Sequence, residues 1–146
     1  MARSVSSTPF STIEKRDPGI VLVISCFTCG FYLIYWYAKM YDELETLTGS
    51  TPTGHSYIVD LLLVIVTCTL YGIWVDYKMA KQLFELQHAN AYPMPADSSQ
   101  MVVLLDAAAW ITGFLTNLVS SAIMQDHLNK LGAFVLERAR ALPYRE

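Results

Sequence analysis

An acidic residue and several small or polar residues recur with helical spacing in the last third of the chain. Asp106 is followed by Asn117 eleven residues later, while Ala109, Gly113, Asn117 and Ser121 recur every four residues. On a helix these positions share one face, and such a face is typical of contacts between helices in lipid. The sequence therefore predicts that this face packs against another helix or, alternatively, lines an ion or proton path, with Asp106 turned away from acyl chains.

Other residue types that carry chemistry lack the partners they would need. Cys26 and Cys29 form a Cys-x-x-Cys inside an apolar run, without a cluster of further ligands, so we interpret both as packing residues. His55, His88 and His127 stand apart, and no set of His, Cys and Asp has the spacing of metal ligands. We therefore expect no catalytic residue, no metal, no cofactor and no enzymatic activity.

The composition departs from that of a soluble domain. Hydrophobic residues make up 53% of the 146 residues and charged residues only 16%, against about 25% charged residues in typical soluble domains. Charged residues are absent from positions 18–38, 61–75 and 107–125. Lys and Arg number 10 against 13 Asp and Glu, a balance that excludes nucleic acid as a partner.

These stretches predict three transmembrane helices, at about residues 19–38, 57–77 and 101–124. Twenty helical residues reach ~30 Å, which matches the hydrocarbon core of a bilayer. Asp60 and Asp76 lie near the two ends of the second stretch, where a carboxylate reaches the headgroup region. We expect a multi-pass protein of the bacterial cell membrane, with Lys15 and Arg16 favouring a cytoplasmic N-terminus.

The sequence repeats itself imperfectly at an offset of 39 residues. The identical pairs are Thr28/Thr67, Cys29/Cys68, Tyr32/Tyr71, Ile34/Ile73, Lys39/Lys78, Met40/Met79, Leu44/Leu83 and Leu47/Leu86. A weaker third copy keeps the spacing of Met124, Leu128 and Leu131. Each copy reads as a span followed by an amphipathic helix that lies in the interface or packs on its neighbours. If each copy crosses the bilayer once, successive copies have opposite orientations.

The predicted fold class is thus an all-α integral membrane protein with three transmembrane helices, each followed by an amphipathic helical extension. We divide the chain into a polar tail at residues 1–18 and three units at residues 19–48, 57–90 and 98–142. Together these units form one membrane domain.

Aromatic residues concentrate at the C-terminal ends of the first two predicted spans. We expect them to form an aromatic belt at each interface, with a ligand-binding aromatic cage as the alternative. Gly30 and Gly72 lie beside them and allow a helix to bend or a neighbour to approach closely. The belt comprises Tyr32, Tyr35, Trp36, Tyr37, Tyr71, Trp74 and Tyr77.

Several of these segments together resemble a known family. They are residues 15–18 (KRDP), 28–37 (TCGFYLIYWY), 71–74 (YGIW) and 125–131 (QDHLNKL). The chain resembles, from about Glu14 to Leu131, the bacterial membrane-protein family numbered 4234 among the domains of unknown function. The second copy fits less closely, because Thr69 and Leu70 replace the expected glycine and aromatic residue. The resemblance implies a bacterial origin and a multi-span helical fold, and it supplies no activity, cofactor or binding residue.

We expect a non-enzymatic protein that acts by association, as a homo-oligomer or as an accessory subunit of a larger membrane complex. The expected partners are membrane lipid and either other membrane subunits or further copies of the chain. One alternative is a small ion or proton channel or transporter that uses the Asp106/Asn117 face. Another is a protein that senses membrane stress or lipid.

Overall fold

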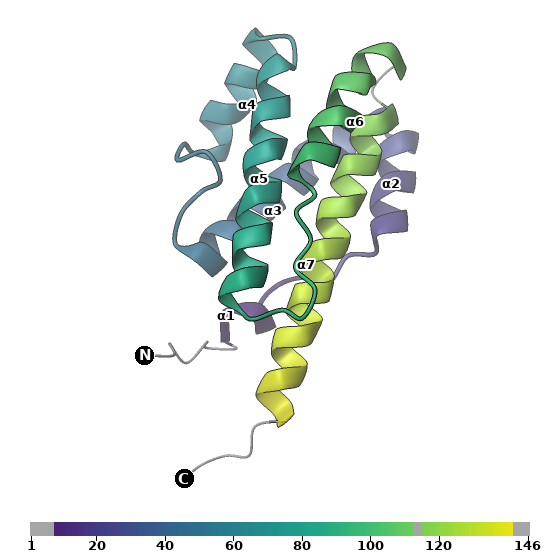
Figure 1. Ribbon diagram of the computed structural model, residues 1–146. Helices are drawn as coiled ribbons and strands as arrows, with labels where there is room; N and C mark the ends of the chain where they lie inside the picture. Colours follow the sequence, from purple (N-terminus) through teal and green to yellow (C-terminus); the bar gives the residue numbers. More distant parts are fainter. Residues whose placement is uncertain (1–7, 113–114, 142–146) are drawn as a thin grey trace.

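The computed structural model of the protein describes residues 8–112 and 115–141. These residues form seven helices and no strand (Figure 1). The helices are α1 (Thr8–Ser11), α2 (Pro18–Phe27), α3 (Phe31–Thr48), α4 (Tyr57–Val66), α5 (Leu70–Ala89), α6 (Ser99–Thr112) and α7 (Leu115–Ala141).

The prediction of three transmembrane helices is wrong. Among the helices of the described residues, none combines the length and the apolar character needed to cross a bilayer. The stretch 19–38 divides between α2 and α3, the stretch 57–77 between α4 and α5, and the stretch 101–124 between α6 and α7. We predicted a multi-pass protein of the cell membrane with a cytoplasmic N-terminus. This localisation is also wrong, because it depended on the three transmembrane helices.

A threonine hydroxyl stands at each of the first two breaks. Thr28 Oγ1 donates to the carbonyl of Ile24 at 2.8 Å and accepts from the backbone N–H of Tyr32 at 3.1 Å. At the equivalent break, Thr67 Oγ1 donates to the carbonyl of Leu63 at 2.7 Å and accepts from the N–H of Tyr71 at 3.0 Å. Each threonine thus satisfies backbone groups on both sides of a break.

The residues after each threonine reverse the chain in a left-handed conformation. Cys29 and Gly30 have φ of 49° and 87°, and Cys68 and Thr69 have φ of 50° and 73°. The N–H of Gly30 bonds the carbonyl of Ser25 at 2.8 Å, the long hydrogen bond of a Schellman motif. These motifs end α2 and α4, so that each 39-residue copy contains two helices in place of one span.

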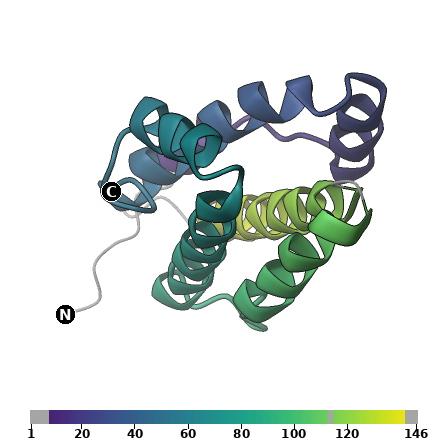
Figure 2. The ribbon, with the colours of Figure 1, turned by 90° about the horizontal axis from the view of Figure 1, so that it is seen from above.

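The repeated unit is therefore a helical hairpin. In Figure 1, α2, α4 and α6 run upward, away from both chain termini, and α3, α5 and α7 run back down. The copies consequently share one direction, and the expectation of opposite orientations is wrong. Seen from above in Figure 2, α5, α6 and α7 lie side by side, and α3 and α4 lie along one flank.

The methionines and leucines of the repeat form the core. α7 packs on α2, α5 and α6, which brings the three copies together. The apolar faces of the predicted amphipathic helices thus pack on one another. The fully buried residues of this pattern are Met40, Leu44, Met79, Leu83, Met124, Leu128 and Leu131.

Candidate functional site

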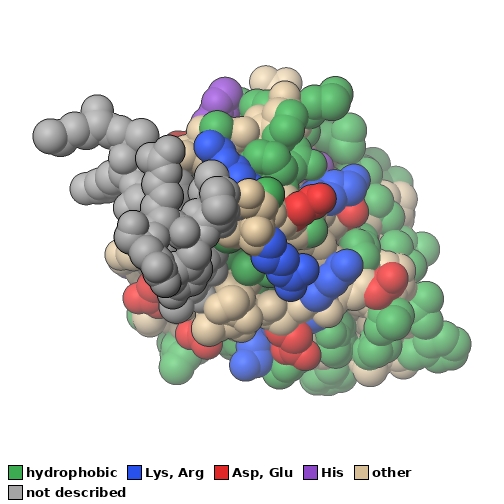
Figure 3. Space-filling view, turned by 90° about the horizontal axis from the view of Figure 1, so that it is seen from below, with side chains coloured by type: hydrophobic (Ala, Val, Ile, Leu, Met, Phe, Trp, Pro, Cys, Tyr) green, Lys and Arg blue, Asp and Glu red, His purple; other side chains and the backbone are tan. Residues whose placement is uncertain are grey.

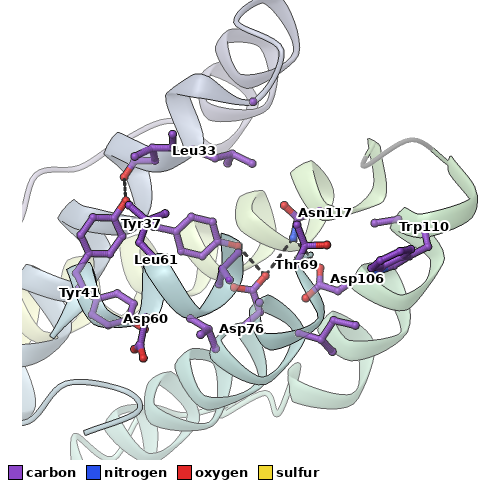
Figure 4. A pocket seen from close by; sticks show the side chains of 18 residues that line it. Leu33, Tyr37, Tyr41, Asp60, Leu61, Thr69, Asp76, Asp106, Trp110 and Asn117 are labelled. Atoms are coloured by element: carbon purple, nitrogen blue, oxygen red, sulfur yellow. Dashed lines mark hydrogen bonds between the residues drawn. The ribbon is translucent and has the colours of Figure 1, made fainter. Parts of the chain in front are cut away.

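A cavity of about 270 Å³ lies among the hairpins (Figure 4). Its lining is mostly aliphatic and aromatic, and Trp110 stands at one side of it. Three acidic residues also line it, namely Asp60 of α4, Asp76 of α5 and Asp106 of α6. No lysine, arginine or histidine is found among the described residues of the lining. The cavity therefore combines apolar walls with acidic groups and, among its described lining residues, no basic side chain.

Asp76 and Asp106 are joined through Asn117 of α7. The Nδ2 group of Asn117 donates to Asp76 Oδ2 at 3.2 Å and to Asp106 Oδ1 at 3.0 Å. Tyr37 of α3 donates its hydroxyl to Asp76 Oδ2 at 2.7 Å (Figure 4), and Ser120 donates to Asp106 Oδ1 at 2.7 Å. The exposed fractions of the two aspartates are 1% and 4%. Four helices thus place two buried carboxyl groups around one amide.

Burial disfavours the charged form of both carboxyl groups. It raises the pKa of Asp76 well above its usual value, and the negative charge of Asp106 raises it further. Burial also raises the pKa of Asp106, and this effect exceeds that of the hydrogen bonds it accepts, which lower the pKa. The pKa of Tyr37 is raised by burial and by the charges of both aspartates. The pair therefore holds a proton more tightly than two exposed aspartates do.

Three buried polar atoms of lining residues lack a hydrogen-bond partner. They are Asp76 Oδ1, Asp106 Oδ2 and Thr69 Oγ1. A buried acceptor without a partner is unfavourable, and more so when it carries charge. The cavity wall thus presents two carboxyl oxygens and a hydroxyl without a partner among the other described side chains, and a proton retained by the Asp76–Asp106 pair is the donor available to the two carboxyl groups.

Asp60 has a different environment from the other two acids. Its Oδ2 accepts from Tyr41 at 2.6 Å and from Thr53, and its Oδ1 accepts from Tyr71 at 3.0 Å. His55 Nδ1 lies 3.4 Å from Oδ1. Burial and the hydrogen bond to Asp60 raise the pKa of Tyr41. Both oxygens of Asp60 therefore have donors, so this group is a structural junction between α3, α4 and α5.

The structure brings together part of the face predicted around Asp106. Ala109 and Ser121 are buried like Asp106, and Asn117 is half-buried. Gly113 lies outside the described residues. Asp60 and Asp76 were expected at the headgroup level, yet both are buried. The sequence feature that could have identified Asp76 as a site residue is the 39-residue repeat, in which Asp76 occupies the same position as Tyr37.

The predicted aromatic belt divides into buried and exposed members. Trp36 is fully buried, Tyr32, Tyr37, Tyr71 and Tyr77 are half-buried, and Tyr35 and Trp74 are exposed. The latter two are equivalent in the repeat, and each lies under a lysine. Lys39 Nζ is 5.9 Å from the centroid of the Tyr35 ring, and Lys78 Nζ is 5.6 Å from that of Trp74. Because the hairpins share one direction, these residues do not form two belts on opposite sides.

The three cysteines are free and exposed rather than packed. Cys29 and Cys68 belong to the left-handed turns of the two hairpins. Within residues 8–112 and 115–141, no three His, Cys, Asp or Glu side chains gather in a way that would hold a metal ion.

Large apolar side chains are exposed beside the hairpin turns. The exposed fractions are 86% for Phe27, 78% for Val66 and 90% for Ile111. Phe31, Ile65, Leu70 and Leu115 continue this surface, which we call the apolar end. The opposite end, viewed from below in Figure 3, carries interspersed acidic and basic side chains. Other exposed apolar side chains, including Ile20, Ile58 and Met101, lie near the starts of the ascending helices, so the apolar end is the part of a larger apolar surface that surrounds the turns.

Comparison with known proteins gives one match. The family model described as a domain of unknown function, DUF4234, matches residues 16–85. Neither a curated protein nor a solved structure matches the chain. The matched range contains the first hairpin, α4 and most of α5, and it leaves out residues 125–131. The resemblance inferred from the sequence is thus confirmed over residues 16–85, which match the DUF4234 family model.

Proposed function

We propose that this protein acts by association with a lipid surface, into which the apolar end inserts without crossing it. The observation that carries the proposal is the position of the exposed apolar side chains. Phe27, Val66 and Ile111 come from three different hairpins, and each lies at the end of an ascending helix. An exposed apolar surface of this kind marks an interaction site.

The charge distribution favours lipid as the occupant. The chain carries no charge at residues 18–38, 61–75 and 107–125, which include all residues of the apolar end. Lys39 and Lys78 lie beyond the uncharged parts of the first two hairpins, over the rings of Tyr35 and Trp74. Lysines and amphipathic aromatic rings around an apolar surface are typical of segments at a lipid–water boundary.

The lengths of the helices agree with partial insertion. α2 and α4 have ten residues each, which corresponds to ~15 Å of helix. This is about half the thickness of the hydrocarbon core. In the first two turns, the threonine hydroxyls and the Schellman hydrogen bonds pair backbone polar groups, which favours insertion into an apolar medium.

Flotation of the purified full chain with vesicles of phosphatidylcholine and phosphatidylglycerol tests the proposal. We expect the protein to float with the vesicles, and the triple variant Phe27→Asp/Val66→Asp/Ile111→Asp to remain in the dense fraction. Met94→Asp is the matched control, because Met94 is 80% exposed and lies in the connection between α5 and α6. Circular dichroism verifies that all variants keep their helices.

The same experiment separates lipid binding from self-association or from a role as a subunit. If the triple variant floats as well as the wild-type chain, insertion of the apolar end is wrong. If the wild-type chain stays with the dense fraction as a homo-oligomer that the triple variant does not form, the apolar end is an interface between copies.

A further inference from the structure

We infer that the cavity between α3, α5, α6 and α7 binds a small organic cation, an ammonium group on an apolar body, with Asp76 and Asp106 as its counter-charges. This inference does not depend on lipid binding, because the cavity and the apolar end use different residues.

The first argument is the match between free acceptors and donors. Asp76 Oδ1, Asp106 Oδ2 and Thr69 Oγ1 are buried without partners and belong to one lining. A primary ammonium group carries three N–H donors and a positive charge. It can therefore donate hydrogen bonds to carboxyl oxygens of this kind and balance the charge of the pair, and charge-assisted bonds of this type are strong.

The second argument excludes other classes of ligand. An anion would meet two carboxyl groups and, among the described lining residues, no basic side chain. A metal ion would meet the amide N–H2 of Asn117, which points at both carboxylates and donates to them. Hard cations need six or more oxygen ligands, and the described residues hold no group of three acidic, His or Cys side chains suited to a metal.

The third argument concerns the apolar body of the ligand. Apart from the acidic residues, the walls are mainly aliphatic and aromatic, with Leu61, Val64 and Trp110 among them. The volume of about 270 Å³ is smaller than typical drug-binding pockets, which begin near ~300 Å³. The cavity thus suits a molecule with one ring or a short branched chain, and aromatic side chains stabilise a cation near them.

Binding is expected to release a proton. The titratable groups that face Asp76 and Asp106 within the described lining are Tyr37, Tyr41, Tyr57 and Asp60, and none of them is a cation. Without a cation, burial raises the pKa of both carboxyl groups, the charge of Asp106 raises that of Asp76 further, and a retained proton is favoured. An ammonium group that replaces this proton leaves both carboxylates ionised, so one proton passes to the buffer for each ligand bound.

Calorimetric titration of the full chain, kept in a non-ionic detergent, tests this inference. The probe is 2-phenylethylamine, which is compared at pH 7 with the neutral 2-phenylethanol and the anionic 3-phenylpropionate. We expect binding of the amine alone, with a heat that differs between buffers of different ionisation enthalpy as proton release requires. The absence of amine binding at millimolar concentration, or equal binding of the alcohol, would overturn the inference.

Substitutions at Asp76 and Asp106 test whether the amine binds at this pair. Asp76→Asn and Asp106→Asn keep the shape of the side chain and remove its charge, and we expect each to weaken amine binding roughly tenfold to a hundredfold. Asp97→Asn is the matched control, because Asp97 lies outside the lining. Unchanged amine affinity in both Asp76→Asn and Asp106→Asn would contradict the assignment. Displacement of the amine to the same extent by a few millimolar potassium chloride and by a few millimolar sodium chloride would also contradict it. The proton release of the wild-type chain tests the inference even if a variant fails to fold.

Discussion

The hydroxyl of Tyr37 donates a 2.7 Å hydrogen bond to Asp76 Oδ2, and these two residues occupy the same position in successive copies of the 39-residue repeat. The two hairpins therefore meet at equivalent positions that have diverged into a donor and an acceptor. Asn117 then links Asp76 to Asp106 from the third hairpin. The contact between repeat-related residues is thus the centre of the polar cluster.

Replacement of this donor tests its contribution. Tyr37→Phe removes one of the two hydrogen bonds that Asp76 Oδ2 accepts, and we expect the free energy of unfolding to fall by about 1–2 kcal/mol. The pKa of Asp76 is expected to rise further, because the Tyr37 hydrogen bond lowers it. Urea unfolding measures the first effect, and Tyr35→Phe, at an exposed ring two residues away, is the control. Equal effects of the two substitutions would contradict the role of this hydrogen bond.

The aspartate pair predicts an unusual dependence of stability on pH. Its pKa values are raised in the folded chain, so the folded state binds protons more tightly than the unfolded state. The stabilisation is complete below the pKa of an unfolded aspartate, ~3.9, and is lost as the pH rises through the raised values of the folded chain. We therefore expect the free energy of unfolding to fall as the pH rises above ~3.9.

Substitution separates this effect from other titrations. In urea unfolding at several pH values, Asp76→Asn and Asp106→Asn should flatten the decline. Asp97 behaves in the opposite way, because its hydrogen bonds with Lys81 and Ser99 lower its pKa to about 2. Its contribution is lost as the pH falls below ~3.9, and Asp97→Asn should leave the profile above pH 4 unchanged. A decline that persists in both pair variants would show that the pair is not its source.

The two hairpin turns offer a reciprocal test of backbone strain. Thr69 has φ of 73° in the second turn, where the first turn has Gly30 with φ of 87°. A β-branched residue is disfavoured in this region, and Thr69 Oγ1 has no hydrogen-bond partner to lose. We expect Thr69→Gly to raise the free energy of unfolding by about 1 kcal/mol, as measured by thermal or urea unfolding.

The reverse substitution in the first turn, Gly30→Thr, should change the free energy of unfolding in the opposite direction. A Cβ atom at Gly30 would meet no atom within 4 Å, so Gly30→Thr should lower stability through backbone strain alone, by about 1–2 kcal/mol. A loss of stability in both variants would contradict the interpretation that backbone conformation decides the effect.

The buried bond between Trp36 and Gln125 should contribute to packing between the first and third hairpins. Trp36 Nε1 donates to Gln125 Oε1 at 2.8 Å, and both side chains are fully buried. Gln125→Leu leaves the indole N–H without an acceptor, and we expect a loss of about 1–3 kcal/mol in the free energy of unfolding.

A double-mutant cycle isolates that interaction. In a Trp36→Phe background no indole N–H remains, so Gln125→Leu should cost about 1 kcal/mol less than in the wild-type chain. Strictly additive effects in urea unfolding would rule out a stabilising bond between the two side chains.

The sequence by itself determined the helical class, the 39-residue period and the resemblance to the family whose model matches residues 16–85. These properties depend on local composition and on spacing along the chain, which a linear pattern records. The repeated methionines and leucines also identified residues that became the core, such as Met40 and Met79. The length of an uncharged stretch, however, did not determine whether it forms one helix.

Only the tertiary structure decided where the helices end and which polar residues meet. The breaks after Phe27 and Val66 depend on threonine hydroxyls that bond the backbone and on residues in left-handed conformation. The hydropathy of the sequence does not reveal either the threonine hydrogen bonds or the left-handed residues. Asp76 and Asp106 are 30 residues apart in the sequence, and they become neighbours because α5 packs on α6 while α7 supplies Asn117 to both. Burial then gives these carboxyl groups the raised pKa values that composition and spacing do not show, since desolvation is a property of the packed molecule.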